Sequence, residues 1–194
     1  MNDWSSASLQ ESLNGSYLSG TNLVSGKGIT SATNDMIETV TWKLGGTASY
    51  TSASNGLASH FYGYERGETV YSNHETIWEG KIGLMYPSDY GYATSGGSTT
   101  NRSSCLAKEL YNWDSSSYSY CKSNDWLYDS STVQWTLTPY SSNSHSVFYV
   151  YYNGNVISNS YARLSNAVRP SVYLKSNIAI SGGDGSIGFP YQIK

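Results

Sequence analysis

Residues 135–174 read WTLTPYSSNSHSVFYVYYNGNVISNSYARLSNAVRPSVYL and decide how the rest of the chain is interpreted. At the front, Trp135 and Leu137 alternate with threonines as far as Pro139, which is the period-two pattern of a half-buried strand. At the back, Arg169-Pro170 leads into residues 172–174, Val-Tyr-Leu, which predict a second strand. The two ends therefore have framework character, and they enclose a middle part of different composition.

The middle part, residues 140–166, is dominated by Tyr, Ser and Asn, with one His and one Arg. A soluble core cannot be built from that mixture, but antibody-like recognition loops use it. In such loops Tyr gives rigid amphipathic contact area, and Ser, Asn and Gly give adaptable hydrogen bonds. The composition therefore favours a recognition surface over a catalytic pocket. The alternative is a polar surface hairpin that binds no ligand.

Asn153-Gly154 is a strong turn signal, because both residue types tolerate positive φ. A three-residue loop over residues 152–154, with Gly154 in the left-handed region, places Val150 opposite Val156 on one face of a hairpin. A two-residue loop would separate the two valines. The other face would then carry four polar or aromatic side chains, those of Tyr149, Tyr151, Asn155 and Asn159.

The order WTLTP, a Ser/Asn/Tyr-rich hairpin and AVRPSVYL resembles the C-terminal part of bacterial proteins with the C-type lectin fold. These include the variable proteins of diversity-generating retroelements and formylglycine-generating-enzyme-like domains. The resemblance covers the last third of the chain strongly and the middle loosely. It implies an α+β, C-type lectin-like fold with short helices, a small antiparallel sheet and a loop-rich C-terminal half. In retroelement proteins randomised adenines convert Asn codons, and residues 142–166 resemble a product of that process.

The resemblance implies a non-catalytic protein that displays a diversified surface to a protein or glycan ligand on another cell or surface. It implies a location outside a bacterial cell or on a phage particle, with membrane contact only through an anchor preceding Met1. The alternative function is structural, as a pilin-like or cell-wall-displayed domain without a diversified site. The candidate ligand-binding residues are Asn143, His145, Tyr149, Tyr151, Tyr152, Asn153, Asn155, Asn159, Tyr161, Arg163 and Asn166.

The whole chain has 194 residues, which predicts one domain with its own core. We divide it into a scaffold (1–134), the variable hairpin region with its framework strands (135–174) and a C-terminal strand and turn (175–194). Eleven basic and fourteen acidic side chains give a net charge of −3, so a basic face for nucleic acid is not expected. No apolar run is long enough for a transmembrane helix.

Cys105 and Cys121 flank a Tyr/Ser-rich loop. A disulfide there would close about 15 residues and stabilise the fold by ~3 kcal/mol in the chain-entropy model. An exported protein would form it, and the alternative is two unpaired thiols. With two Cys and three scattered His, a zinc site is not expected.

Catalytic and cofactor motifs are not visible in the sequence, so neither an enzyme nor a cofactor is predicted. Formylglycine-generating oxidases use two cysteines late in the chain, where this sequence has none. The E-P-N or Q-P-D and W-N-D triplets of calcium-dependent lectins are also missing. The glycine run at 182–186 has one carboxylate, which favours a turn over a calcium loop. Arg169 is expected to bond buried carbonyls as a scaffold residue.

Residue spacing predicts the remaining elements. Short helices are expected over residues 6–18 and 104–113, and a third over 33–44, where the β-rich residues 39–42 leave a strand as the competitor. Residues 61–67 are predicted to be a turn-rich aromatic patch packed under a loop. The other expected elements are strands at 79–86 and 177–180, a helical turn or tight loop at 88–93, and loops at 20–28, 47–56 and 115–120. The tryptophans are assigned to the scaffold, with Trp126 and Trp135 inside.

Overall fold

The structure is a computed structural model that describes residues 1–21, 28–97, 101–185 and 188–194. Helix makes up 26% and strand 25% of the chain, and the named strands pair antiparallel in small sheets. The predicted α+β class is therefore confirmed. Most of the predicted loop at 20–28, together with Ser186, lies outside the described residues. Within the described ranges, none of the helices combines the length and the apolar character needed to span a bilayer.

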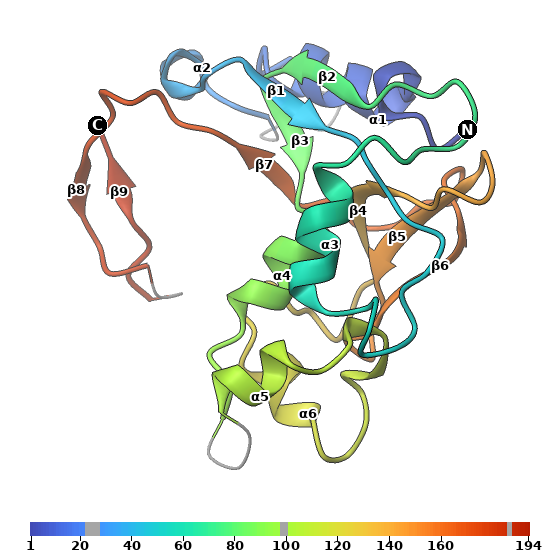
Figure 1. Ribbon diagram of the computed structural model, residues 1–194. Helices are drawn as coiled ribbons and strands as arrows, with labels where there is room; N and C mark the ends of the chain where they lie inside the picture. The colour runs from blue at the N-terminus through green and yellow to red at the C-terminus, as the bar shows by residue number, and fades with distance from the viewer. Residues whose placement is uncertain (22–27, 98–100, 186–187) are drawn as a thin grey trace.

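A three-stranded sheet forms the centre of the molecule and is buried on both faces (Figure 1). Its strands are β4 (Gln134–Pro139), β5 (Ser146–Val150) and β6 (Val156–Tyr161), in the order β4-β5-β6. Phe148 and Val150 of β5 belong to one core cluster, and Tyr149 between them belongs to a second cluster with Trp135. Alternate side chains of β5 thus pack into core clusters on opposite faces of the sheet, because successive side chains of a strand point to opposite faces.

Three two-stranded sheets complete the strands. They are β1 (Val40–Lys43) with β2 (Ile77–Gly80), β3 (Ile82–Leu84) with β7 (Pro170–Val172), and β8 (Ile180–Gly182) with β9 (Gln192–Ile193). The predicted strand at 79–86 is divided between β2 and β3. Asn14 holds the division, because its side-chain oxygen accepts hydrogen bonds from the backbone N–H groups of Lys81 (3.2 Å) and Ile82 (2.9 Å).

The hairpin between β5 and β6 has the predicted register. Val150 pairs with Val156, and Tyr151 N donates to Asn155 O at 2.9 Å. The loop between them is residues 152–154, with Gly154 at φ +91°. The local turn chemistry was therefore sufficient to place this hairpin.

The predicted helix at 33–44 is wrong beyond Met36. Helix α2 (Ser31–Met36) is short, and β1 follows it. The strand alternative prevails because the β-branched residues Val40 and Thr41 precede Trp42, which is 2% exposed and packs in the second core. The N-terminal helical prediction is confirmed in three short pieces: η1 (Trp4–Ser6), α1 (Ser8–Ser12) and η2 (Leu13–Tyr17).

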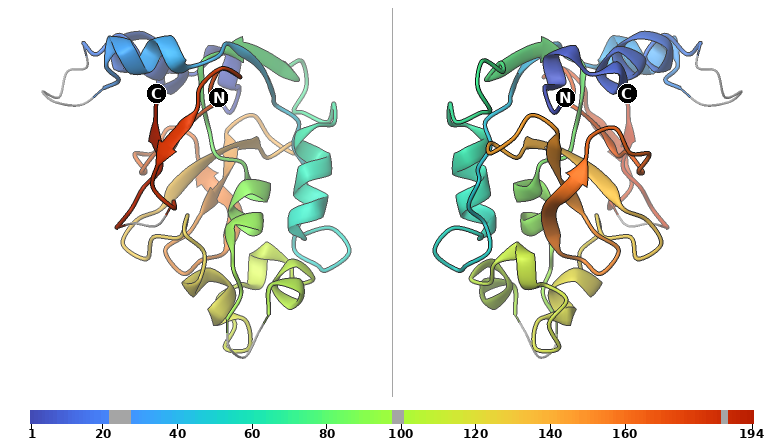
Figure 2. Two further views of the ribbon diagram at one scale, coloured as in Figure 1. Left: turned by 90° about the vertical axis from the view of Figure 1, so that its left-hand side faces the viewer. Right: turned by 90° about the vertical axis from the view of Figure 1, so that its right-hand side faces the viewer.

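Helix α3 (Ala58–Glu65) occupies most of the segment that was predicted to be a turn-rich patch. His60 Nδ1 accepts a hydrogen bond from Leu57 N at 3.3 Å, which begins the helix. Phe61 is fully buried, with its ring 5.1 Å from that of Phe148. Figure 2 shows α3 beside α4 (Pro87–Ala93) and close to the three-stranded sheet. The helical alternative for residues 88–93 is thus confirmed.

The predicted helix at 104–113 is shorter than expected. The structure has α5 (Arg102–Leu106), then η3 (Leu110–Asn112) and α6 (Ser119–Ser123). Leu110 N leaves the helical pattern to donate to Gly56 O at 2.9 Å. A disulfide joins Cys105 to Cys121 and closes the loop that carries η3. We call residues 105–121 the disulfide loop.

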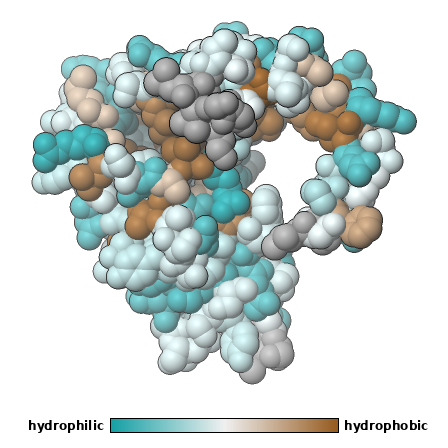
Figure 3. Space-filling view, turned by 180° about the vertical axis from the view of Figure 1, so that it is seen from behind, coloured by the Kyte–Doolittle hydropathy of each residue, from teal (hydrophilic) through white to brown (hydrophobic). Residues whose placement is uncertain are grey.

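The described C-terminal residues, 175–185 and 188–194, include β8 and β9 and form an arm that extends away from the body (Figures 1 and 3). Strand β8 begins where the predicted strand at 177–180 ends, and the described part of the glycine run turns through Gly183 and Gly185, both with positive φ. Trp126 is 72% exposed, which contradicts its expected place inside, whereas Trp135 is buried.

Candidate functional site

The eleven predicted site residues do not converge on one patch. They divide between the two ends of the β5–β6 hairpin and its interior. The tip, residues 151–155, faces the disulfide loop, and the open end contains residues 143–145 and 161–163. Asn166 lies apart from both, next to Ala167, which bridges to Gln134.

The hairpin tip is clamped by the disulfide loop. Asn153 Nδ2 donates to Asp114 Oδ2 at 2.9 Å, and Asn155 Oδ1 accepts from Asp114 N at the same distance. The carbonyl of Asn153 accepts from Lys122 Nζ at 2.6 Å, and that of Gly154 from the Tyr90 hydroxyl at 2.8 Å. The polar groups of Asn153 and Asn155 are therefore engaged within the chain. Tyr152, at 51% exposed, is the tip side chain that faces solvent.

Replacing Gly154 with alanine should destabilise the protein by about 1–3 kcal/mol, because a Cβ would be strained at positive φ. It would also collide with the side chain of Lys122. Gly63, inside α3, is the matched control, since nothing lies within 4 Å of a Cβ there. Gly63→Ala should be neutral or stabilising. Urea midpoints of the two variants measure the difference, and equal midpoints would show that the tip is not held as described.

Tyr149 lies in the interior of the protein. It is 3% exposed, its ring lies 5.7 Å from the Trp135 ring, and its hydroxyl bonds to the side-chain oxygen of Asn159. Burial raises the pKa of Tyr149. The expectation that this side chain faces solvent is corrected, because the N-terminal segment covers that side of the sheet. Tyr151 packs between the rings of Tyr149 (6.0 Å) and Tyr152 (4.0 Å).

Three predicted residues come together at the open end of the hairpin. The rings of His145 and Tyr161 are 4.8 Å apart, and Arg163 Cζ lies 5.3 Å from the Tyr161 ring. All three side chains are exposed, and we call them the rim stack. Asn143 shapes the adjoining turn, because its side-chain oxygen accepts from the N–H groups of His145 and Ser146.

A cavity of about 370 Å³ lies between the N-terminal segment and the three-stranded sheet. Arg163 belongs both to its wall and to the rim stack. Asn2 fixes the segment there: its side-chain NH₂ donates to the carbonyls of Tyr140 (3.1 Å), Asn143 (3.0 Å) and Ser146 (2.6 Å). The walls are formed by Met1, Asn2, Asp3, Trp4, Ser6, Ala7, Ser8, Leu9, Leu84, Trp135, Thr136, Leu137, Val147, Ala162 and Arg163.

Sequence reasoning missed the N-terminal half of this cavity. Asn2 and Trp4 precede the first periodic helical residues, so no spacing pattern includes them. The presence of a tryptophan so early in a polar segment was the one available signal. Arg169 was assigned correctly: its Nε donates to the Gln134 side-chain oxygen (3.0 Å) and its Nη2 to the Leu127 carbonyl (3.2 Å).

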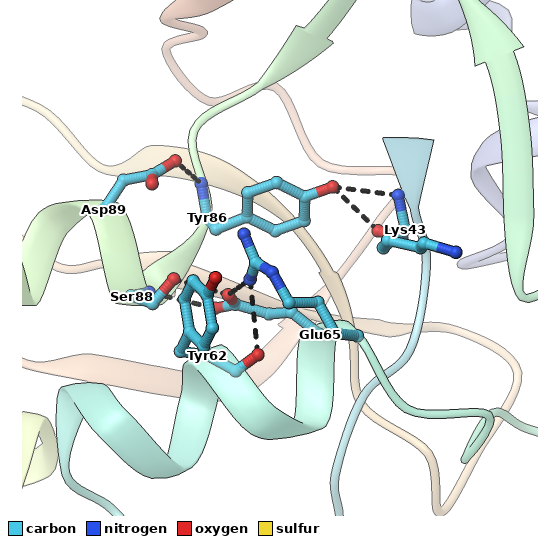
Figure 4. A network of polar contacts seen from close by, with 7 residues as sticks. Lys43, Tyr62, Glu65, Tyr86, Ser88 and Asp89 are labelled. Carbon is cyan, nitrogen blue, oxygen red and sulfur yellow. Dashed lines mark hydrogen bonds and ion pairs between the residues drawn. The ribbon is translucent and has the colours of Figure 1, made fainter. Parts of the chain in front are cut away.

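Two buried carboxyl groups have strongly shifted pKa values. Burial raises the pKa of Glu65, which is 0% exposed, to about 7, although Ser88 donates to it through both its N–H and its hydroxyl (Figure 4). Burial likewise raises the pKa of Asp125 to about 8. Shifted carboxyls are candidates for acid–base chemistry. Neither residue lines the cavity, and Glu65 is enclosed between α3 and α4.

Arg66 completes the Glu65 network. Its Nη1 lies 3.3 Å from Glu65 Oε2, and its guanidinium carbon lies 3.5 Å from the centre of the Tyr62 ring. Asp89 Oδ2 accepts from Tyr86 N at 2.9 Å at the start of α4. This arrangement joins two helices and leaves no room for a substrate at the carboxyl group.

Metal-binding groups are not assembled in the part of the chain that the structure describes: no three His, Cys, Asp or Glu residues are grouped so that they could hold an ion. Comparisons of the chain with protein families, with curated proteins and with solved structures find no match.

Proposed function

We propose that this protein is a non-catalytic recognition domain of C-type lectin-like fold, acting outside a bacterial cell or on a phage particle. Its ligand site is the cavity together with the rim stack of His145, Tyr161 and Arg163. The observation that carries the proposal is that Arg163 lines a largely apolar cavity and also contacts Tyr161, which in turn contacts His145. The sequence had singled out all three of these exposed residues for binding. Concave apolar sites with a few polar groups are the usual form of ligand sites.

The chemistry of the cavity wall supports binding over catalysis. Its ionisable side chains, among the described residues, are one carboxylate, Asp3, and one guanidinium, Arg163. Cys105 and Cys121 are held in a disulfide, which fits an exported protein and leaves neither thiol for oxidase chemistry. Diversification by a retroelement belongs to the same proposal and rests on the sequence resemblance.

A displayed structural domain is the second candidate. It is favoured by Tyr149, Asn153 and Asn155, because the polar groups of these predicted site residues have partners within the chain. This alternative predicts that the protein binds no ligand through the hairpin.

Binding of the labelled protein to an array of bacterial-surface glycans and peptides tests the proposal. The double variant Tyr161→Ala, Arg163→Ala should bind at least about tenfold more weakly, because aromatic and arginine side chains dominate binding sites. Tyr152→Ala is the matched control, since it removes a similarly exposed tyrosine, 51% against 45%, at the clamped tip. An equal loss in both variants would overturn the assignment, and a wild-type protein that binds nothing on the array would favour the structural alternative.

A further inference from the structure

The described part of the C-terminal arm is a hairpin in which no residue is fully buried. Its backbone hydrogen bonds join its own two strands: Ala179 N donates to Lys194 O at 3.2 Å, and Lys194 N donates to Ala179 O at 3.1 Å. An isolated two-stranded hairpin is only marginally stable in water, because stability needs further strands or a surface to pack on. The arm therefore needs a partner that covers it.

One face of this hairpin is apolar and open to solvent. Ile180 of β8 and Ile193 of β9 are cross-strand neighbours, so their side chains lie on the same face, whereas Gln192 lies on the other. Ile180 is 62% exposed, and Tyr191, which directly precedes β9, is exposed as well. Burial of this face against another molecule would remove apolar surface from water, which is favourable.

The outer edge of β8 can accept a further strand. Ala179 and Lys194 exchange both of their backbone hydrogen bonds, so the N–H and C=O groups of the next residue, Ile180, point away from β9. Strand β8 lies on the outer side of the arm, with β9 between β8 and the body (Figure 1). Residues 177–182, Asn-Ile-Ala-Ile-Ser-Gly, contain neither a charged side chain nor a proline, two of the devices that prevent pairing at strand edges.

We infer that the protein forms a two-fold dimer in which β8 pairs antiparallel with β8 of a second copy. The axis passes between the two Ile180 residues, which become a hydrogen-bonded pair, and a four-stranded sheet of order β9-β8-β8-β9 results. Ile193 and Ile180 of both copies then form one apolar row across the four strands, so the arm gains the strands and the cross-strand contacts that it lacks alone. This inference goes beyond the proposed recognition function and does not depend on it.

A second copy of the chain fits this edge. A two-fold axis places the same segment of each copy opposite itself, and the uncharged residues 177–182 bring no like charges together there. Because β8 lies on the outer side of an arm that is separated from the body by open space (Figure 3), the two bodies do not collide when the arms pair. Strand β8 has only three residues, so the dimer is expected to be weak, with a Kd of about 10–100 μM.

Sedimentation equilibrium of the full chain at about 1–300 μM tests the inference and should show a reversible monomer–dimer equilibrium. Ile180→Lys places like charges opposite each other across the axis and should weaken dimerisation at least about tenfold. Ile77→Lys is the matched control, because Ile77 is also an exposed isoleucine (48%) of a two-stranded sheet, β1–β2, but lies on the body. This control should dimerise like the wild type.

Ile180→Cys identifies the contact itself. The Cα atoms of a hydrogen-bonded antiparallel pair lie about 5.5 Å apart, which suits a disulfide, and Cys105 and Cys121 are already bonded to each other. Mild oxidation should therefore link two copies through residue 180, whereas Ile77→Cys should stay unlinked. A wild type that remains monomeric throughout, or equal dimerisation of the two lysine variants, would overturn the inference. A dimer that forms without cross-linking at residue 180 would also overturn it, because the arm would then pack elsewhere on the partner.

Discussion

Raising the pH from about 5 to 8 should destabilise this protein by about 3 kcal/mol through Glu65 alone. Its pKa lies at about 7 in the folded chain, against 4.5 as the reference value. Between these values the unfolded chain has released its proton while the folded chain retains it, so the stability that protonation provides is lost as pH rises through this window. Asp125, with a pKa of about 8, acts in the same direction.

Glu65→Gln isolates the effect of this carboxyl group. The amide imitates the protonated acid, can still accept from Ser88 N, and cannot ionise, so the variant should exceed the wild type in stability at pH 8 and lose much of the pH dependence. Urea midpoints at pH 5, 6, 7 and 8 measure this. Asp129→Asn is the control, because hydrogen bonds from Ser131 hold the pKa of Asp129 below its usual value and its effect is confined to acid pH. A wild-type midpoint that rises with pH would contradict the assignment of Glu65 as a buried neutral acid.

Replacing Cys105 and Cys121 together with serine should cost about 3 kcal/mol, because the unfolded chain regains the freedom of a loop of about 15 residues. The variant should also loosen the hairpin tip, since Asp114 and its two hydrogen bonds to Asn153 and Asn155 lie within that loop. Urea midpoints report the first effect. Hydrogen exchange at Asp114 N, which bonds to Asn155 Oδ1, reports the second.

The control for the disulfide variant is the open end of the hairpin. Ala162 N donates to His145 O at 2.8 Å there, far from the disulfide loop along the hairpin. In the variant, the Ala162 N–H should lose no more protection from hydrogen exchange than the drop in global stability accounts for. If Asp114 N and Ala162 N lose protection equally under native conditions, the disulfide does not clamp the tip selectively.

Local chemistry predicted the hairpin well. The Asn153-Gly154 turn and the spacing of Val150 and Val156 fix the register within seven residues of chain, so no distant contact was needed. The α+β class was predicted from the family resemblance. The two cysteines made a disulfide possible but left two unpaired thiols as the alternative, and the structure has the disulfide. Helix α3 could not be predicted in this way, because its stability comes from distant partners such as Phe148 and Ser88.

The site itself was predicted only in part. Sequence spacing placed Tyr149 on the face opposite the valines, but it could not show that Trp4 and its neighbours cover that face. The N-terminal segment is held over the sheet by a hydrogen bond from the Asn2 side chain to Ser146 O, 144 residues away. A contact between residues so far apart in the chain produces no periodic pattern in the sequence. The rim stack was anticipated as a set of residue types, and its position beside a cavity emerged only from the fold.

Because the disulfide loop holds the tip of the β5–β6 hairpin, substitutions at the tip and at the open end of the hairpin have different consequences. At the tip, a substitution at Asn153 or Asn155 removes a hydrogen bond to Asp114 in the disulfide loop. A compensating substitution in that loop would then be needed to restore the contact. At the open end, Tyr161 and Arg163 face water and contact each other. A lineage can therefore exchange residues there singly, which lets the outer surface evolve at a different pace from the inherited frame.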